Sequence, residues 1–178
     1  MTVHLVYETH SVTEDNEAGI ATGWLPGRLS EQGRVQAAEL GERRRGEALA
    51  AVYASDLRRA VDTAVIAFGA GFVPLRLDPR LRDCNYGRLN GAPVTQLHPV
   101  RLAHVDTPFP GGQSYRDVVE STAGFLDDVR RDHDGERVLV IAHSANRWAL
   151  QHLLDGTPLE QLVTAPFDWQ PGWEWTLT

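Results

Sequence analysis

Short apolar runs and amphipathic segments alternate along this chain. Continuous runs rich in β-branched residues predict buried strands, at residues 3–9, 51–54, 73–77 and 137–142, with an apolar edge strand at 173–177. Apolar residues at helical spacing after capping residues predict helices over about 31–46, 56–68, 114–131, 145–154 and 158–163. This alternation predicts an α/β fold, a three-layer α/β/α sandwich with a mostly parallel central sheet.

Two stretches of the chain show no helical or strand-like period of apolar residues. A long loop rich in glycine follows the first strand, and residues 78–113, rich in glycine and proline, are expected to be irregular. Within them, segments 17–28 and 84–113 are the candidates for substrate specificity, because loops carry function on a rigid scaffold. Without repeats or a linker, residues 1–178 are interpreted as a single domain.

Composition narrows the classes of function. The net charge is −7, and all 17 basic residues are arginine without a long basic run, which argues against binding to nucleic acid or an anionic membrane. No apolar run is long enough to cross a membrane, and no export signal opens the chain, so a cytoplasmic protein is expected. The single Cys84 cannot form an internal disulfide.

Two histidines follow matched strands. His10 comes after the first strand and His143 after the strand at 137–142, so both are expected at the carboxyl edge of the sheet, where open α/β folds bind ligands. No spacing typical of a metal site is present, and a metal is not expected. Cysteine-based and serine-based hydrolysis also lack their motifs, since Asn90 stands six residues after Cys84 and no serine has a Gly-x-Ser-x-Gly context.

Six sequence blocks, in order, resemble the histidine phosphatase superfamily, the phosphoglycerate mutase-like proteins. The opening block resembles Arg-His-Gly-x-Thr-x-x-Asn, with His, Thr and Asn in register, and the others resemble the later motifs of the family. The blocks are Thr9-His10-Ser11-Val12-Thr13-Glu14-Asp15-Asn16, Leu29-Ser30-Glu31-Gln32-Gly33-Arg34-Val35-Gln36-Ala37, Ser55-Asp56-Leu57-Arg58-Arg59-Ala60-Val61-Asp62-Thr63-Ala64, Leu81-Arg82-Asp83-Cys84-Asn85-Tyr86-Gly87, Pro110-Gly111-Gly112-Gln113-Ser114 and Ala142-His143-Ser144.

The resemblance implies a role for each matched residue. His10 would attack phosphorus and carry a transient phosphohistidine, while Arg59 and His143 would hold the phosphoryl oxygens. Asp83 stands where the family often has a proton-donating glutamate, although a turn-forming role is an alternative for it. Asn16, in register with the motif, is a further candidate phosphate ligand. No cofactor is implied.

The chain also departs from the family pattern. Thr9 replaces the first arginine of the motif, and serines, Ser11 and Ser144, replace the glycines after the two histidines. A lost charged hydrogen bond is worth roughly 1.5–3 kcal/mol. The hydroxyl of Ser11 could bind phosphate in part compensation, and Arg28 is the hypothesised replacement cation. Arg147 is interpreted as a surface residue.

The resulting prediction is a metal-independent phosphomonoester hydrolase acting on a small phosphorylated metabolite. The alternative is a catalytically altered or inactive member that binds an anionic or other ligand in the same pocket. A phosphoglycerate mutase is less favoured, because a chain of 178 residues leaves little room for the segments that enclose phosphoglycerate in mutases. The apolar edge strand at 173–177 is compatible with a homodimer.

Overall fold

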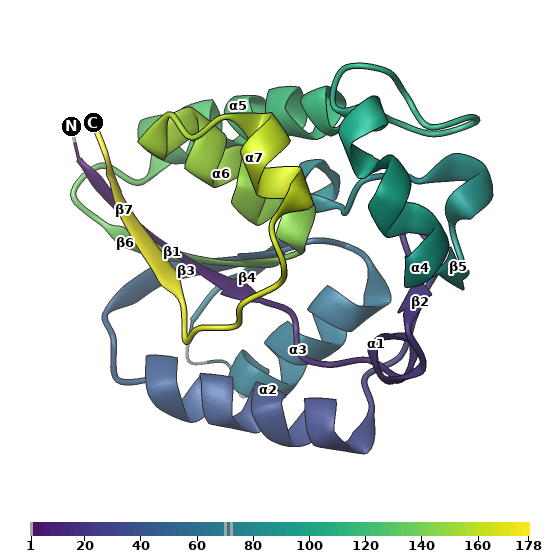
Figure 1. Cartoon of the computed structure of the whole chain (residues 1–178). Coiled ribbons are helices and arrows are strands. Elements are labelled where there is room, and N and C mark those ends of the chain that lie inside the picture. The colour runs from purple at the N-terminus through teal and green to yellow at the C-terminus, as the bar shows by residue number, and fades with distance from the viewer. Residues whose placement is uncertain (1, 70, 72) are drawn as a thin grey trace.

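A five-stranded sheet forms the centre of the molecule (Figure 1). The computed structural model describes residues 2–69, 71 and 73–178. The strands of the central sheet run in the order β4-β3-β6-β1-β7, parallel except for β7, which pairs antiparallel with β1 at the edge. They are β1 (Val3–Thr9), β3 (Leu49–Ala54), β4 (Leu75–Leu77), β6 (Arg137–Ala142) and β7 (Trp173–Leu177).

Helices cover both faces of this sheet (Figure 1), which confirms the predicted three-layer α/β fold. On one face lie α2 (Glu31–Arg44) and α3 (Arg58–Phe68), and on the other lie α5 (Tyr115–Asp132) and α6 (Ser144–Asp155), followed by α7 (Leu159–Thr164). Alternate residues of β6 enter the two cores: Leu139 packs with α2 and α3, whereas Val140 packs with α5 and α6. Because both faces of the central strands are buried, these strands are continuous apolar runs in the sequence.

The strands predicted at 137–142 and 173–177 match the structure, while β3 begins two residues before its prediction and β4 is shorter than predicted. The two stretches expected to be irregular contain elements too short to show a period in the sequence. These are α1 (Glu14–Ala18), the paired strands β2 (Ile20–Ala21) and β5 (Ala92–Pro93), α4 (Val94–Leu97), and 3₁₀ helices η1 (Pro79–Leu81), η2 (Gly87–Leu89) and η3 (His98–His104). None of the described helices is both long and apolar enough to cross a membrane.

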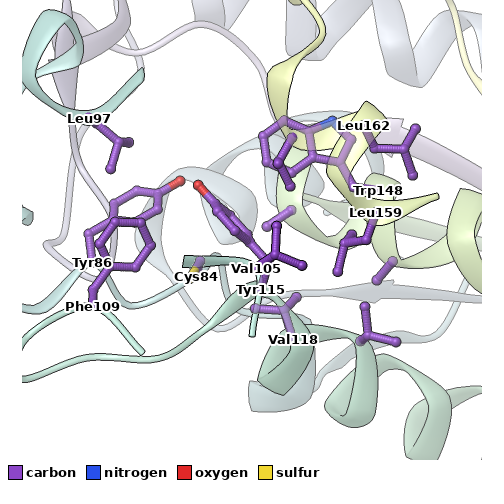
Figure 2. Packing of buried hydrophobic residues seen from close by; sticks show 14 of the residues in the cluster. Cys84, Tyr86, Leu97, Val105, Phe109, Tyr115, Val118, Trp148, Leu159 and Leu162 are labelled. Atoms are coloured by element: carbon purple, nitrogen blue, oxygen red, sulfur yellow. The ribbon is translucent and has the colours of Figure 1, made fainter. Parts of the chain in front are cut away.

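A third apolar cluster anchors the segment between η1 and α5 to the rest of the fold. Figure 2 shows Tyr86 and Phe109 packing beside Tyr115, with Trp148 of α6 on the far side. The rings of Tyr115 and Trp148 meet edge to face, with centroids 5.5 Å apart. Leu97 and Val105, at the two ends of η3, are both buried in this cluster. The cluster therefore fixes η3 above the carboxyl edge of the sheet.

The start of α2 is packed directly against the loop that follows β1. Ser30 caps the helix, and the main-chain nitrogen of Ser30 donates to the carbonyl oxygen of Val12 at 3.1 Å. A side chain at Gly33 would collide with that same carbonyl. Glycine at this position therefore allows the close approach that positions the loop after His10.

We expect Gly33→Ala to destabilise the protein by about 1–3 kcal/mol, since the added methyl group meets main-chain atoms that cannot rotate away. Gly124→Ala in α5 is the matched control: its methyl group meets only the tip of Arg80 at 4.0 Å, so alanine is expected to stabilise the helix by about 0.4–1 kcal/mol. Thermal unfolding of both variants checks the pair. Equal stabilities of the two variants would contradict the packing argument.

Candidate active site

The two histidines meet at the carboxyl ends of neighbouring parallel strands. The nitrogen of His10, just after β1, donates to the carbonyl oxygen of Ala142, the last residue of β6. This hydrogen bond of 3.0 Å brings the two imidazole rings to a centroid distance of 5.0 Å. The juxtaposition predicted from the strand pattern is therefore present.

The ring of His10 is neutral, and one of its two nitrogens is engaged in a hydrogen bond. Burial and the neighbouring Arg59 guanidinium lower the pKa of His10 to about 3. Nδ1 lies 2.8 Å from the carbonyl oxygen of Ser11. Because a carbonyl oxygen only accepts, Nδ1 carries the proton, and the lone pair of the neutral ring is on Nε2.

His143 is fully buried between the sheet and α6. Its main-chain nitrogen donates to Asn146 Oδ1 at 3.0 Å, and its Nε2 lies 2.9 Å from Ser55 Oγ. The Ser55 oxygen already accepts a hydrogen bond from the nitrogen of Leu57, so its own proton can be donated to Nε2. Nδ1 of His143 is buried and has no hydrogen-bond partner among the described residues. Burial, Arg59 and His10 hold the pKa of His143 well below its usual value.

Arg59, at the start of α3, forms an ion pair with Asp83, which is partly buried in the loop after η1. Arg59 Nη2 donates to the carbonyl oxygen of Gly23 at 2.8 Å and to Asp83 Oδ2 at 3.3 Å, while Nη1 donates to the carbonyl oxygen of Leu25. Asp83 Oδ1 accepts from the nitrogen of Cys84 at 2.8 Å. Burial raises the pKa of Asp83 despite the Arg59 charge, and burial lowers the pKa of Arg59.

Two cavities meet at His10. The smaller, about 120 Å³, is lined by His10, Asn16, Arg59 and Asp83. The larger, about 520 Å³, extends past Thr9 and Ser11 toward α2 and the segment before β7. A phosphoryl group in the smaller cavity would therefore face a neutral imidazole, a guanidinium and a carboxyl group of raised pKa.

Comparison with known proteins agrees with this geometry. The sequence model of the histidine phosphatase superfamily (branch 1) matches residues 9–169. The chain belongs to the histidine phosphatase superfamily. The matched range begins at Thr9-His10-Ser11, the block whose first residue carries no charge.

The similar proteins and solved structures are named for several different enzyme activities. The chain is 29% identical over 167 residues to phosphoserine phosphatase 1 of Hydrogenobacter thermophilus, covering 89% of this chain and 79% of that protein. It is 30% identical over 175 residues to a 2,3-bisphosphoglycerate-dependent phosphoglycerate mutase of Parvibaculum lavamentivorans, covering 89% and 83%. Among solved structures, Bacillus stearothermophilus YhfR superimposes with a TM-score of 0.82 at 29% identity, covering 95% of this chain and 88% of that one.

A mycobacterial glucosyl-3-phosphoglycerate phosphatase also shares the fold, with a TM-score of 0.77 at 28% identity, covering 92% of this chain and 84% of that one. Its named substrate differs from those of the other relatives. Members of the histidine phosphatase superfamily that resemble this chain to a similar degree thus differ in the organic part of the molecule on which they act.

The structure brings most of the sequence-predicted site residues together, but not Arg28. His10, Asn16, Arg59 and Asp83 share the smaller cavity, and Ser11 lines the larger one. His143 lies beside His10 but is fully buried and lines neither cavity. The side chain of Arg28 is exposed and forms an ion pair with Glu14 at 3.0 Å, and Arg28 lines neither cavity. The hypothesis that Arg28 replaces the motif arginine loses its structural basis.

Arg147 is not the surface residue predicted from the sequence. Its side chain is buried, with the guanidinium 4.8 Å from the ring centre of Trp173 and 5.6 Å from that of Phe167. The surface interpretation rests on Trp148 standing where the resemblance implies an arginine, whereas in the structure the segment before β7 folds back over Arg147. Arg147 thus stacks between aromatic rings instead of reaching solvent.

Arg101 was missed by the sequence analysis. It comes from η3, in the stretch without a helical or strand period, and lines both cavities together with His10, Asn16 and Ser144. The docking of η3 beside the apolar cluster of Tyr86, Tyr115 and Trp148 brings it to the site. The sequence predicts only that segment 84–113, which contains Arg101, contributes to substrate specificity.

Proposed function

We propose that the protein hydrolyses small phosphomonoesters through a covalent phosphohistidine on His10. The observation that carries the proposal is the state of this ring. A neutral imidazole whose Nδ1–H is held by the Ser11 carbonyl oxygen presents an unshared pair on Nε2 next to the cavity shared with Arg59 and Asp83.

In the first half-reaction, His10 Nε2 forms a bond to phosphorus as the phosphorus–oxygen ester bond breaks. The leaving oxygen takes the proton of the Asp83 carboxyl group, and the burial that raises the pKa of this group favours its protonated form. In the second half-reaction, the Asp83 carboxylate removes a proton from water, the water oxygen bonds to phosphorus, and the phosphorus–nitrogen bond breaks. Inorganic phosphate leaves and both residues return to their initial states.

The equatorial oxygens of the phosphoryl group gain negative charge during both steps and need fixed donors. Arg59 supplies a guanidinium already oriented by the carbonyl oxygens of Gly23 and Leu25. If Ser55 donates to Nε2 of His143, the proton of that neutral ring lies on Nδ1, the nitrogen without a partner among the described residues. That N–H group is the second proposed donor to the phosphoryl oxygens.

Size and relatives support a small phosphorylated metabolite as substrate. The smaller cavity of about 120 Å³ accommodates a phosphoryl group and a few further atoms, and the adjoining cavity has room for an organic part. Similar proteins include a phosphoserine phosphatase and a glucosyl-3-phosphoglycerate phosphatase, which act on phosphomonoesters of small molecules.

Thr9 favours one competing function, a family member that binds an anion without turning it over. Turnover of p-nitrophenyl phosphate and of a panel of small alkyl phosphates decides between the two. We expect hydrolysis, together with acid-labile phosphate trapped on His10 by rapid quenching. Binding of inorganic phosphate without hydrolysis or a phosphoenzyme would establish the competing function.

The pH dependence of kcat/KM follows from the two titrating groups. Protonated Asp83 is the acid, so activity is expected to fall as pH rises through its raised pKa. On the acid side, His10 stays neutral well below pH 6.5, because its pKa is about 3. Profiles between about pH 4 and about pH 9 should therefore show an alkaline limb and no limb from His10 near pH 6. An acid limb that persists near pH 6, after correction for ionisation of the substrate, would contradict the assignment.

A further inference from the structure

The site of this chain lacks a charge that the motif of its family provides. A bound phosphomonoester carries a charge of about −1.5 to −2 near pH 7. Thr9 contributes no charge where the motif has arginine, and part of the hydrogen-bonding capacity of Arg59 is taken by Gly23, Leu25 and Asp83. A second cation close to His10 would restore the balance.

Arg101 lies where such a cation is needed. It lines the smaller cavity together with Arg59 and Asp83, and it lines the larger cavity together with Thr9. It also borders a third cavity beside Trp148 and Phe167. Arg101 thus stands at the junction of these cavities.

The guanidinium of Arg101 stacks on the ring of Trp148 and, where the structure describes the chain, is not paired with a carboxylate. It lies 5.2 Å from the ring centre of Trp148 and forms no ion pair among the described residues. Its charge acts on Asp83 and lowers the pKa of that carboxyl group, against the larger effect of burial. The Nε of Arg101 is buried and has no hydrogen-bond partner in the described part of the chain. A cation stacked on an aromatic ring keeps the N–H groups at its edge available, and these match the oxygens of a phosphate in a forked geometry.

The position of Arg101 is fixed by the fold of its segment. Leu97 and Val105 anchor the two ends of η3 in the cluster of Figure 2, while Arg101 lies between them on the cavity side. Side-chain packing therefore holds the arginine near the catalytic histidine before any ligand binds. Such preorganisation reduces the entropy lost when the anion is bound.

We propose that Arg101 binds the phosphoryl oxygens of the substrate and supplies the charge that the motif arginine provides elsewhere in the family. The proposal rests on the proposed function only in taking the anion to be a phosphate or phosphomonoester. On this proposal, a residue of η3 takes the binding role that the family motif gives to a residue of β1. Affinity for phosphate then depends on how segment 79–114 packs against the rest of the fold.

Calorimetric titration of the full chain with inorganic phosphate, and separately with orthovanadate, tests the proposal. We expect Arg101→Gln, which keeps much of the side-chain stem, to weaken both affinities about 10- to 100-fold, the loss typical of one or two charged hydrogen bonds. Arg101→Lys should lose less, because it keeps the charge but not the fork. Arg58→Ala is the matched control, since it removes an arginine that pairs with Asp62 at an exposed position.

Arg28→Ala is the competing variant. If Arg28→Ala weakens phosphate binding while Arg101→Gln and Arg101→Lys leave it unchanged, the assignment to Arg101 is overturned. Absence of phosphate and vanadate binding by the parent also overturns it. Circular dichroism and the unfolding midpoint show whether each variant is folded, and the lysine variant provides the comparison if the glutamine variant is not.

The outcomes separate this inference from the proposed hydrolysis. Phosphate binding that depends on Arg101, without turnover or a phosphoenzyme, supports the inference and contradicts the hydrolase. Turnover with phosphate affinity unchanged in both Arg101 variants supports the hydrolase and contradicts the inference.

Discussion

Replacing His10 with alanine is expected to lower phosphomonoester turnover by about four to six orders of magnitude. The variant loses the Nε2 lone pair, and no described neighbour can take its place: His143 is fully buried with Nε2 at 2.9 Å from Ser55 Oγ. Inorganic phosphate should still bind, since Arg59 and Arg101, which line the same cavity, remain. Initial rates and phosphate titrations on the same preparation measure the two effects separately.

The matched control is His4→Ala, in the same strand but at its exposed end and away from the cavities. It should leave both turnover and phosphate affinity unchanged. A His10→Ala variant that retains more than about a tenth of the parent rate would exclude His10 as the nucleophile. Retained phosphoenzyme in that variant would place the covalent bond on another residue.

Asp83→Asn is expected to reduce hydrolysis of alkyl phosphates by about 10²- to 10⁴-fold, the usual contribution of a positioned acid or base. With p-nitrophenyl phosphate the loss in the first half-reaction should be much smaller, because the nitrophenolate anion leaves without a proton. Burst kinetics distinguish the two half-reactions. The phosphoenzyme should accumulate in this variant, since water must then attack without a base.

Asp127→Asn, which removes an exposed carboxylate paired with Arg130, is the corresponding control and should behave as the parent. Equal losses in the rate of phosphoenzyme formation from alkyl and nitrophenyl substrates would assign Asp83 a different role. The hydrogen bond from Arg59 to Asp83 would then matter for the position of the guanidinium, not for proton transfer.

The elements with a strong period were predictable from the sequence. The run 137–142 is β6 residue for residue, because burial on both faces selects an unbroken apolar strand. Ser30 caps α2 as predicted, with its oxygen accepting from the nitrogen of Gly33. The short pair β2 and β5 was missed, since two residues on each side give no periodic signal and the pairing joins distant parts of the chain.

The same distinction applies to the site. His10 and His143 could be placed together because adjacent parallel strands end at one edge of the sheet. Arg28 and Arg101 could not be told apart, because both lie in segments without a period. Only the tertiary contacts of Leu97 and Val105 decide which of them reaches the cavity. Arg147 is buried for a similar reason, through a segment that folds over it.

The hydrogen bond between Nδ1 of His10 and the carbonyl oxygen of Ser11 also bears on the lifetime of the intermediate. Once Nε2 is phosphorylated, the ring still holding its Nδ1 proton is cationic, and a neutral carbonyl compensates that charge less than a carboxylate would. The imidazole is then a good leaving group. The phosphoenzyme should be short-lived, and an acceptor other than water would have to be in place within that lifetime for the phosphoryl group to be transferred instead of released.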